Sequence, residues 1–170
     1  MGLPRKLKNM MVFHNGVAYV GEATSVTLPK LARKLEEYRA GGMDGPVGID
    51  MGQDGLLELE HAYGGFMREI IRGFGVTEAD GEMLRFVGAY QRDDSGEVDR
   101  VEIVARGRHQ EIDPGEAKPG EDTEFKVKTV LAYYKLEVNG VEEVEIDVLN
   151  MVFRVGGVDR LAAQRAALGI

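Results

Sequence analysis

Residues 125–148 read FKVKTVLAYYKLEVNGVEEVEIDV, and they carry the clearest secondary-structure signal in the chain. Valine is frequent, and Asn139-Gly140 is a dipeptide that accepts the positive φ angles of a tight hairpin turn. The stretch therefore predicts a long strand over 125–138 that turns back into a partner strand over 141–148. Residues 130–134 are apolar on both faces, which indicates burial on both sides or a subunit contact.

Two further segments read as antiparallel hairpins. Residues 11–13 and 17–20 flank Asn15-Gly16, a second dipeptide that favours a tight turn. Residues 84–90 and 101–107 alternate apolar and polar side chains, and an Asp-Asp-Ser-Gly turn lies between them. With 23 glycines among 170 residues, the composition favours short strands joined by tight turns over a helical bundle.

Single strands and short helices complete the pattern. Residues 24–28 read as a strand, and residues 57–63 alternate apolar and polar side chains in the manner of a half-buried strand. Residues 66–74 fit a short amphipathic helix. Residues 159–168 are Ala-rich and precede a glycine, which predicts a C-terminal helix that begins at Asp159.

Three segments are less regular. Residues 1–9 are polar or basic apart from Leu3 and Leu7, so we expect an N-terminal arm with no packing of its own. Residues 30–39 carry apolar side chains at helical spacing and, taken alone, predict a helix. Glycines punctuate residues 41–55, which therefore predict a long loop with exposed apolar side chains.

Size and charge limit the possible functions. A chain of 170 residues forms one ordinary domain, and its net charge of −8 opposes non-specific attraction to nucleic acid or anionic lipid. The absence of cysteine excludes disulfides, thiolate nucleophiles and thiolate metal sites. No apolar run approaches the roughly 18 residues of a membrane span, so we expect a soluble protein made in the cytoplasm.

No motif for catalysis stands out. His14, His61 and His109 are the candidate general bases, but none lies beside a serine in a recognisable nucleophile motif, so we interpret all three as structural. The acidic cluster at 93–97 lacks the alternating carboxylates of a calcium loop. No glycine-rich phosphate-binding motif is present either. The sequence therefore predicts a protein that is not an enzyme and has no metal or cofactor.

Several short sequence segments resemble the major tail tube protein of contractile-tailed bacteriophages and the related R-type pyocins. They are VTLPKL at 26–31, EYRAGGMD at 37–44, IDMG at 49–52, GAYQRDD at 88–94, IDPGE at 112–116, YYKLE at 133–137 and GVDRL at 157–161. They extend over nearly the whole chain. The resemblance includes phage tails and bacteriocins alike, and the sequence does not choose between them.

The resemblance implies a mainly β domain over 1–170, with two packed antiparallel sheets forming a barrel-like sandwich and one flanking short helix. Members of the family keep the stretch after Leu-Pro-Lys extended, so residues 30–39 become an expected strand. Hexameric rings would stack into a tube around a lumen, inside a contractile sheath, with baseplate and terminator proteins at its ends. The protein would reside in the virion tail, without tight DNA binding or membrane insertion.

Two sets of site residues follow from this implied architecture. Apolar side chains without evident packing partners in the arm and the 41–55 segment, with an aspartate beside them, are expected to contact other subunits. These residues are Leu3, Leu7, Met43, Asp44, Ile49 and Met51. Carboxylates that alternate with core positions are expected to face the lumen, where they would let a polyanion slide past; these are Glu36, Glu58 and Glu60.

A function of another class remains open from the residues alone. The domain could be a monomeric β-sandwich module that uses the 41–55 segment to hold a small ligand or a peptide. Size-exclusion chromatography separates a monomeric module from a ring-forming subunit.

Overall fold

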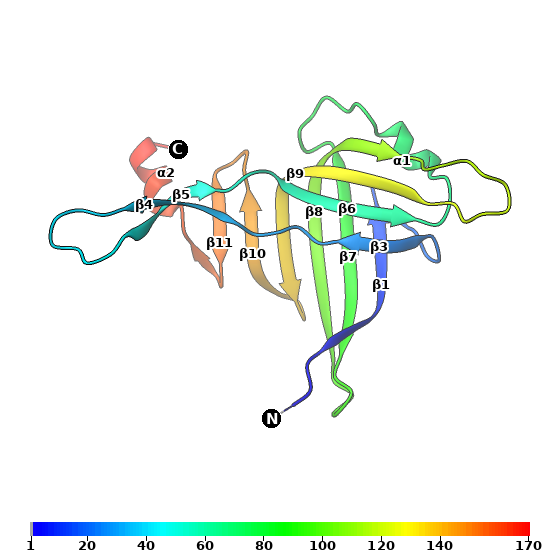
Figure 1. Cartoon of the computed structure of the whole chain (residues 1–170), viewed down its shortest axis with the longest axis horizontal. Helices are drawn as coiled ribbons and strands as arrows, with labels where there is room; N and C mark the ends of the chain where they lie inside the picture. The colour runs from blue at the N-terminus through cyan, green and yellow to red at the C-terminus, as the bar shows by residue number, and fades with distance from the viewer. Residues whose placement is uncertain (1) are drawn as a thin grey trace.

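The structure is a computed structural model that describes residues 2–170. Twelve strands and two short helices make up the described chain (Figure 1). In chain order they are β1 (Lys6–His14), β2 (Val17–Ala18), β3 (Ala23–Thr27), β4 (Arg33–Tyr38), β5 (Val47–Gln53), β6 (Leu57–Tyr63), α1 (Arg68–Arg72), β7 (Glu82–Gln91), β8 (Val98–Asp113), β9 (Phe125–Val138), β10 (Val141–Asp147), β11 (Val152–Val155), β12 (Val158–Asp159) and α2 (Ala162–Leu168). The expected mainly β, antiparallel fold is confirmed.

Strand β9 runs through both parts of one continuous ten-stranded sheet. Along one edge it pairs with β8 over almost its full length. Along the other edge, residues 125–131 pair with β6 and residues 133–138 pair with β10. We call β3, β6, the first half of β9 and β8 after Gly107 the small sheet. The large sheet holds the second half of β9, the earlier part of β8, and β12, β11, β10, β7, β1 and β2.

The two sheets meet at a corner made by bulges in the long strands. The pairing of β8 with β9 moves from Arg106–Tyr133 to Gly107–Leu131, which leaves Ala132 as the extra residue. A Cβ atom at Gly107 would lie 2.0 Å from the carbonyl oxygen of Val130, so only glycine fits this close approach. The apolar run at 130–134 is therefore the place where β9 crosses from one sheet to the other.

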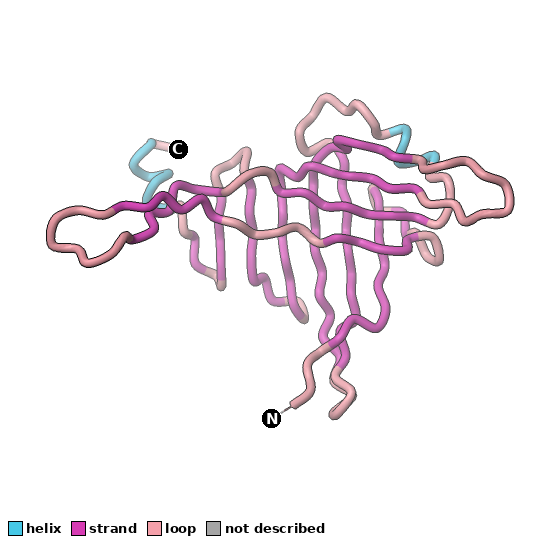
Figure 2. The backbone as a smooth tube through the Cα atoms, viewed as in Figure 1, coloured by secondary structure: helices cyan, strands magenta, loops and turns pink. Residues whose placement is uncertain are grey.

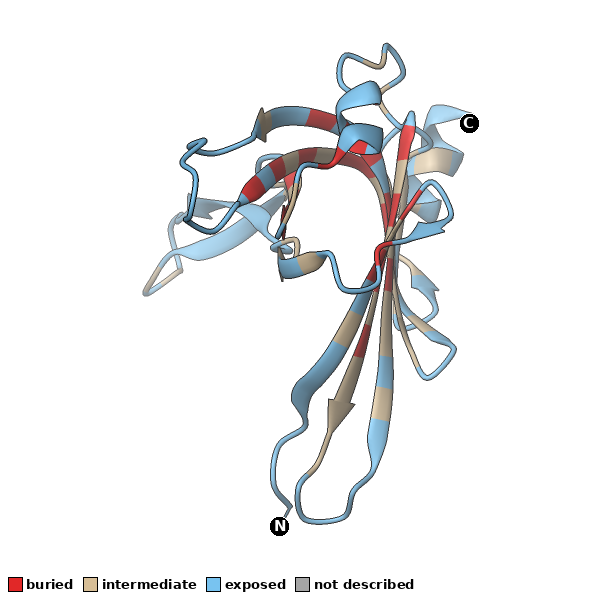
Figure 3. Ribbon diagram, turned by 90° about the vertical axis from the view of Figure 1, so that its right-hand side faces the viewer, coloured by how far each residue is buried: buried red, intermediate tan, exposed pale blue. Residues whose placement is uncertain are grey.

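The sheets cross steeply and enclose an apolar core. In Figure 1, β3, β6 and the first part of β9 run horizontally, whereas β1, β7, β10 and β11 run vertically. Figure 3 shows the buried residues gathered around this crossing, while the extension that carries the N-terminus is more exposed. The core residues between the sheets are Leu57, Leu59, Leu84, Phe86, Ile103, Ala105, Leu131, Tyr134 and Ile146.

A second buried cluster lies beneath α1. It contains Tyr19, Tyr63, Met67, Ile70, Phe125 and Val127. Both helices lie outside the sheets (Figure 2). Helix α1 lies within the expected helix over 66–74, and α2 lies within the expected C-terminal helix. Helix α2 begins at Ala162 rather than Asp159, because Asp159 lies in β12 and its carboxylate pairs with Arg165. Gly169 ends the helix with a φ of 76°, as expected.

The prediction of a long loop over 41–55 is wrong for Val47–Gln53. These residues form β5, which pairs with β4 as a separate two-stranded sheet. Its glycines and aspartate disfavour a strand in isolation, and the backbone pairing with β4 overrides that preference. The revised expectation of a strand within 30–39 is confirmed by β4.

The N-terminal arm is shorter than expected. Strand β1 begins at Lys6 and pairs with β7, so residues 6–9 belong to the large sheet. Salt bridges also join the start of the strand to the β7–β8 hairpin, since Arg5 lies 2.6 Å from the Asp99 carboxylate in β8 and Lys8 lies 2.9 Å from Asp93 in the turn. The local sequence does not predict this strand, because the strand that pairs with it is about 80 residues away along the chain.

The corner leads to a test of the fold. We expect Gly107→Ala to lower the free energy of unfolding by about 1–3 kcal/mol, since the added methyl group meets the Val130 carbonyl. Gly65→Ala is the matched control, because a Cβ there has no heavy atom within 4 Å. Urea unfolding of both variants measures the difference. Equal stability of the two variants would contradict this role for Gly107.

Candidate assembly surfaces

The hairpin of β4 and β5 projects from the body of the domain, at the left of Figure 1. Cross-strand pairs place Tyr38 opposite Val47 and Glu36 opposite Ile49. Side chains alternate along a strand, so Tyr38, Val47, Ile49 and Met51 share one face. We call these four residues the apolar hairpin face. Each of them is between 43 % and 54 % exposed, and an exposed apolar cluster of this kind is typical of an interaction surface.

The base of the hairpin is held against the body. The Arg33 guanidinium lies 3.1 Å from the Asp50 carboxylate and 4.6 Å from the centre of the Phe153 ring. Hydrogen bonds from Arg33 and from the Gly52 N–H hold the pKa of Asp50 below its usual value. The hairpin therefore presents its apolar face in a defined direction.

The six expected contact residues fall into two separate regions. Ile49 lies on the apolar hairpin face with Met51, and Asp44 is exposed at the tip of the hairpin. Met43 is half-buried, because its sulfur accepts a hydrogen bond from the backbone N–H of Ala40 and thereby shapes the turn.

The arm residues lie far from the hairpin, beside the turn between β7 and β8. The backbone N–H of Leu3 donates to the Asp94 carboxylate at 2.9 Å, and Leu3 is 54 % exposed. Leu7 is 44 % exposed although its strand is paired. Both side chains are thus available to a neighbouring subunit.

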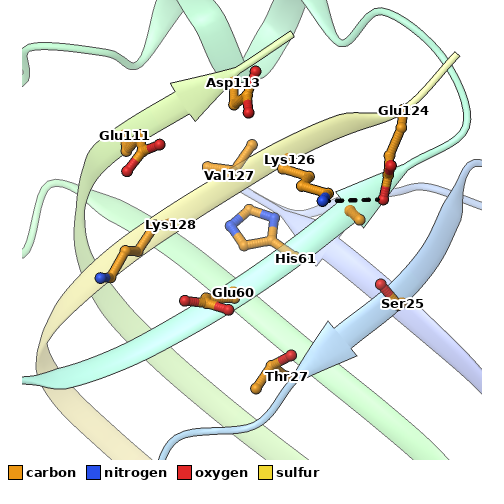
Figure 4. Close-up of a pocket in the computed structure, with 11 residues that line it drawn as sticks. Ser25, Thr27, Glu60, His61, Glu111, Asp113, Glu124, Lys126, Val127 and Lys128 are labelled. Carbon is orange, nitrogen blue, oxygen red and sulfur yellow. Dashed lines mark ion pairs between the residues drawn. The ribbon is translucent and has the colours of Figure 1, made fainter. Parts of the chain in front are cut away.

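The outward face of the small sheet carries ordered rows of charged side chains. In register across four strands, Thr27, Glu60, Lys128 and Glu111 form one row. The next row holds Ser25, Ala62, Lys126 and Asp113. These residues, together with Glu124, line a hollow of about 420 Å³ (Figure 4).

Carboxylates outnumber cations on this face, which we call the acidic face. Glu58 joins it by alternation with Glu60 and lies 3.3 Å from Lys128, while Glu124 lies 3.5 Å from Lys126. Five carboxylates, those of Glu58, Glu60, Glu111, Asp113 and Glu124, share this face with three cations, Lys126, Lys128 and Arg108, the last in the row of Glu58. Glu36 does not belong to this group, because it lies on the separate hairpin sheet, directly opposite Ile49 and therefore on the same side as the apolar hairpin face.

Sequence reasoning did not select Glu111, Asp113, Lys126 and Lys128. Glu111 and Asp113 flank the inward Ile112, and Lys126 and Lys128 flank the inward Val127. This alternation is the sequence signal that could have identified the four residues. Their common position depends on the register of β8, β9 and β6, and that register is not readable from the local sequence.

The small sheet has two open edges. Among residues 2–170, β3 pairs with β6 and with no further strand. The pairing of β7 with β8 ends at Gly107, so residues 108–113 of β8 pair with β9 alone. Unpaired edge strands are templates for pairing with another chain. The small sheet can therefore extend at both sides.

The three histidines are buried in a polar network between strands. Their side chains pack near one another, with ring centres 5.7 Å apart for His14 and His109 and 6.1 Å apart for His61 and His109. Thr129 bridges His61 and His109 through its hydroxyl group at 3.0 and 2.9 Å. Burial lowers the pKa of His61 to about 3 and that of His109 to about 4, so both rings are neutral at pH 7. None of the three is exposed enough to meet a substrate from solution.

Comparison with known proteins decides the family. The sequence profile described as Phage tail tube protein FII matches residues 4–169. The chain belongs to this family. The tail tube protein of Escherichia phage P2 is 51 % identical over 172 residues that include all of both chains. The major tail tube protein of Serratia phage KSP20 is 40 % identical over 158 residues, which are 92 % of this chain and 91 % of that protein.

Solved structures support the same fold at much lower identity. A chain of the sheath–tube complex of an extracellular contractile injection system matches 76 % of this chain and 88 % of its own length, with a TM-score of 0.56 and 10 % identity. A chain from the sheath/tube terminator of that system has a TM-score of 0.57 at 8 % identity, and the match includes 78 % of this chain and 95 % of that one. Neither helix among residues 2–170 is long and apolar enough for a membrane crossing.

The buried histidines predict a loss of stability in acid. The unfolded chain protonates His61 near the ordinary pKa of 6.5, whereas the folded chain does so only near 3. Between these values the unfolded chain binds more protons, so the free energy of unfolding falls as pH falls, by up to ~1.4 kcal/mol per pH unit from this group. Urea unfolding across this pH range should show a shallower dependence in His61→Gln than in the parent chain. The same dependence of the free energy of unfolding on pH in both chains would contradict this contribution of His61.

Proposed function

We propose that this chain is the inner-tube subunit of a contractile phage tail. Six copies form a ring, and rings stack into a tube inside a sheath, with baseplate and terminator proteins at the two ends. The observation that carries the proposal is the 51 % identity to the tail tube protein of phage P2 across the full length of both chains. The protein then resides in the virion tail after synthesis in the host cytoplasm.

The open edges of the small sheet supply the contact that closes the ring. Strand β3 of one subunit pairs with residues 108–113 of the next, which is a head-to-tail contact between two different surfaces. Such a contact repeats around a closed ring and converts six small sheets into one continuous wall. The backbone N–H and C=O groups that have no strand partner at these edges in the isolated chain then form hydrogen bonds.

The acidic face lines the lumen in this arrangement. Its carboxylates repel the phosphates of DNA, and Lys126 and Lys128 are already engaged by Glu124 and Glu58. A wall of this composition lets a polyanion pass without adhering. Glu58 and Glu60 keep the lumenal role expected from the sequence, whereas Glu36 takes a place at the subunit contact.

The apolar hairpin face and the arm supply the remaining contacts. Tyr38, Val47, Ile49 and Met51 together expose a surface that water covers in the isolated chain and that a neighbouring subunit covers in the tube. Leu3 and Leu7 do the same at the far end of the domain. The proposed role is structural rather than catalytic, as the names of the relatives support.

A charge on the apolar hairpin face should block assembly without unfolding the chain. A buried unpaired carboxylate costs several kcal/mol, so we expect Ile49→Asp and Met51→Asp to abolish tubes, and Ile49→Val to retain them. Negative-stain micrographs and size-exclusion chromatography report assembly, and circular dichroism reports the fold. Tubes formed normally by the aspartate variants would remove the hairpin from the contact. A parent chain that stays monomeric at high concentration would favour the ligand-binding module instead.

Reversing the charge of the acidic face should slow DNA passage. We expect Glu60→Lys combined with Glu111→Lys to leave tubes intact and to reduce DNA delivery at least tenfold, because lysines bind phosphate. Glu143→Lys is the control, since this exposed residue lies in β10 of the large sheet. Delivery is measured with phage that carry each variant. Normal delivery by the double variant through intact tubes would contradict a lumenal position for this face.

A further inference from the structure

Three buried side chains converge where β1, β7 and β8 meet. His14 ends β1, Glu82 begins β7, and His109 lies in β8 just beyond the corner at Gly107. Their exposed fractions are 3 %, 4 % and 5 %. Nε2 of His14 lies 2.8 Å from Oε2 of Glu82, and each residue offers a ligating atom within 4.8 Å of those of the other two.

His109 brings an unsatisfied nitrogen to this cluster. Its Nδ1 lies 2.9 Å from the Thr129 hydroxyl group, whereas its Nε2 is fully buried and finds no hydrogen-bond partner among residues 2–170. Buried polar atoms without a partner are uncommon in folded proteins and call for a specific explanation. A metal ion would accept the lone pair of Nε2 and satisfy it.

The geometry points to a buried divalent metal site, with Zn²⁺ as its ion, held by His14, Glu82 and His109. Two imidazoles and one carboxylate form a known type of zinc ligand set, in which water or another group takes the fourth position. Tetrahedral zinc with bonds of about 2.0–2.2 Å holds its ligand atoms about 3.3 Å apart. To reach this spacing on binding the ion, the side chains of His14 and Glu82, now 2.8 Å apart, would separate, and His109, within 4.8 Å of both, would move closer.

Neighbouring groups are placed to orient the ligands. With Nε2 of His109 on the metal, its Nδ1–H donates to Thr129, and Thr129 in turn donates to Nε2 of His61. Nδ1 of His14 lies 3.2 Å from the Tyr19 hydroxyl group, and the Asn15 amide donates to Glu82 at 2.8 Å. Every ligand therefore has a partner that fixes its orientation, as metal sites in proteins usually have.

The site would join three strands at the point where β8 passes from the large sheet into the small sheet. Binding to the folded chain alone raises its stability through mass action. The ion would thus stabilise the corner from which residues 108–113 extend as an open edge. This role is independent of the proposed tube function, because it concerns the isolated chain.

The test measures metal bound by the purified full-length chain. After EDTA treatment and dialysis, the chain is titrated with Zn²⁺, and with Co²⁺ as a spectroscopic probe. We expect one equivalent of Zn²⁺ per chain, a visible Co²⁺ absorption band typical of four-coordinate sites, and a higher melting temperature. His109→Gln and Glu82→Gln should weaken binding by about 10–100-fold or more, whereas the surface control Glu58→Gln should bind as the parent does.

A measurement on the parent chain decides the result even if these variants do not fold. Zn²⁺ should shift the imidazole ¹⁵N resonances of His14 and His109 far more than those of His61. Less than about a tenth of an equivalent of bound metal with no Co²⁺ band would overturn the assignment. Equal binding by folded ligand variants, or ¹⁵N shifts confined to His61, would overturn it as well.

Discussion

The division of β9 between two partner strands is the constraint on which the rest of the structure depends. Its first half pairs with β6 and its second half with β10, while β8 follows it through the bend. The bend requires a residue without a side chain at Gly107 and an extra residue at Ala132. Because the two sheets share these strands, their crossing angle and the core between them are fixed together.

The same bend creates the open edges that we propose as assembly surfaces. The pairing of β7 with β8 ends where Glu82 lies opposite Gly107, so β8 continues into the small sheet with one edge unpaired. Strand β3 leaves the opposite edge of that sheet open. The charged residues between these edges point away from the core, whereas the apolar hairpin face lies on a separate sheet. The proposed edge pairing and the proposed hairpin contact therefore involve different parts of the subunit.

The sequence predicts the local elements well and the long-range pairings poorly. Asn15-Gly16 and Asn139-Gly140 both adopt the positive φ angles that the hairpin assignments required, and the strand at 125–138 is present with the expected bounds. Strand β5 was mistaken for a loop because its formation depends on β4, and residues 6–9 were mistaken for a free arm because β7 is distant in sequence. Family resemblance, rather than periodicity, correctly placed a strand within 30–39.

Site residues show the same limit. Glu58 and Glu60 lie on one face because a strand has a period of two residues, and this is readable from the sequence. Their assembly with Glu111 and Asp113 depends on the register of three strands, as does the meeting of His14, Glu82 and His109. From the sequence we interpret the three histidines as structural, and all three are buried, in agreement with that interpretation. The sequence contains no signal that they lie together.

The central claim is that the small sheet continues from one subunit to the next around a lumen. Cryo-electron microscopy of the assembled tube, at a resolution that traces the strands, tests it most directly. The account predicts β3 of one subunit hydrogen-bonded to residues 108–113 of its neighbour, with Glu60, Glu111 and Asp113 facing the lumen. A tube in which these edges remain apart, or in which the acidic face points outward, would contradict it.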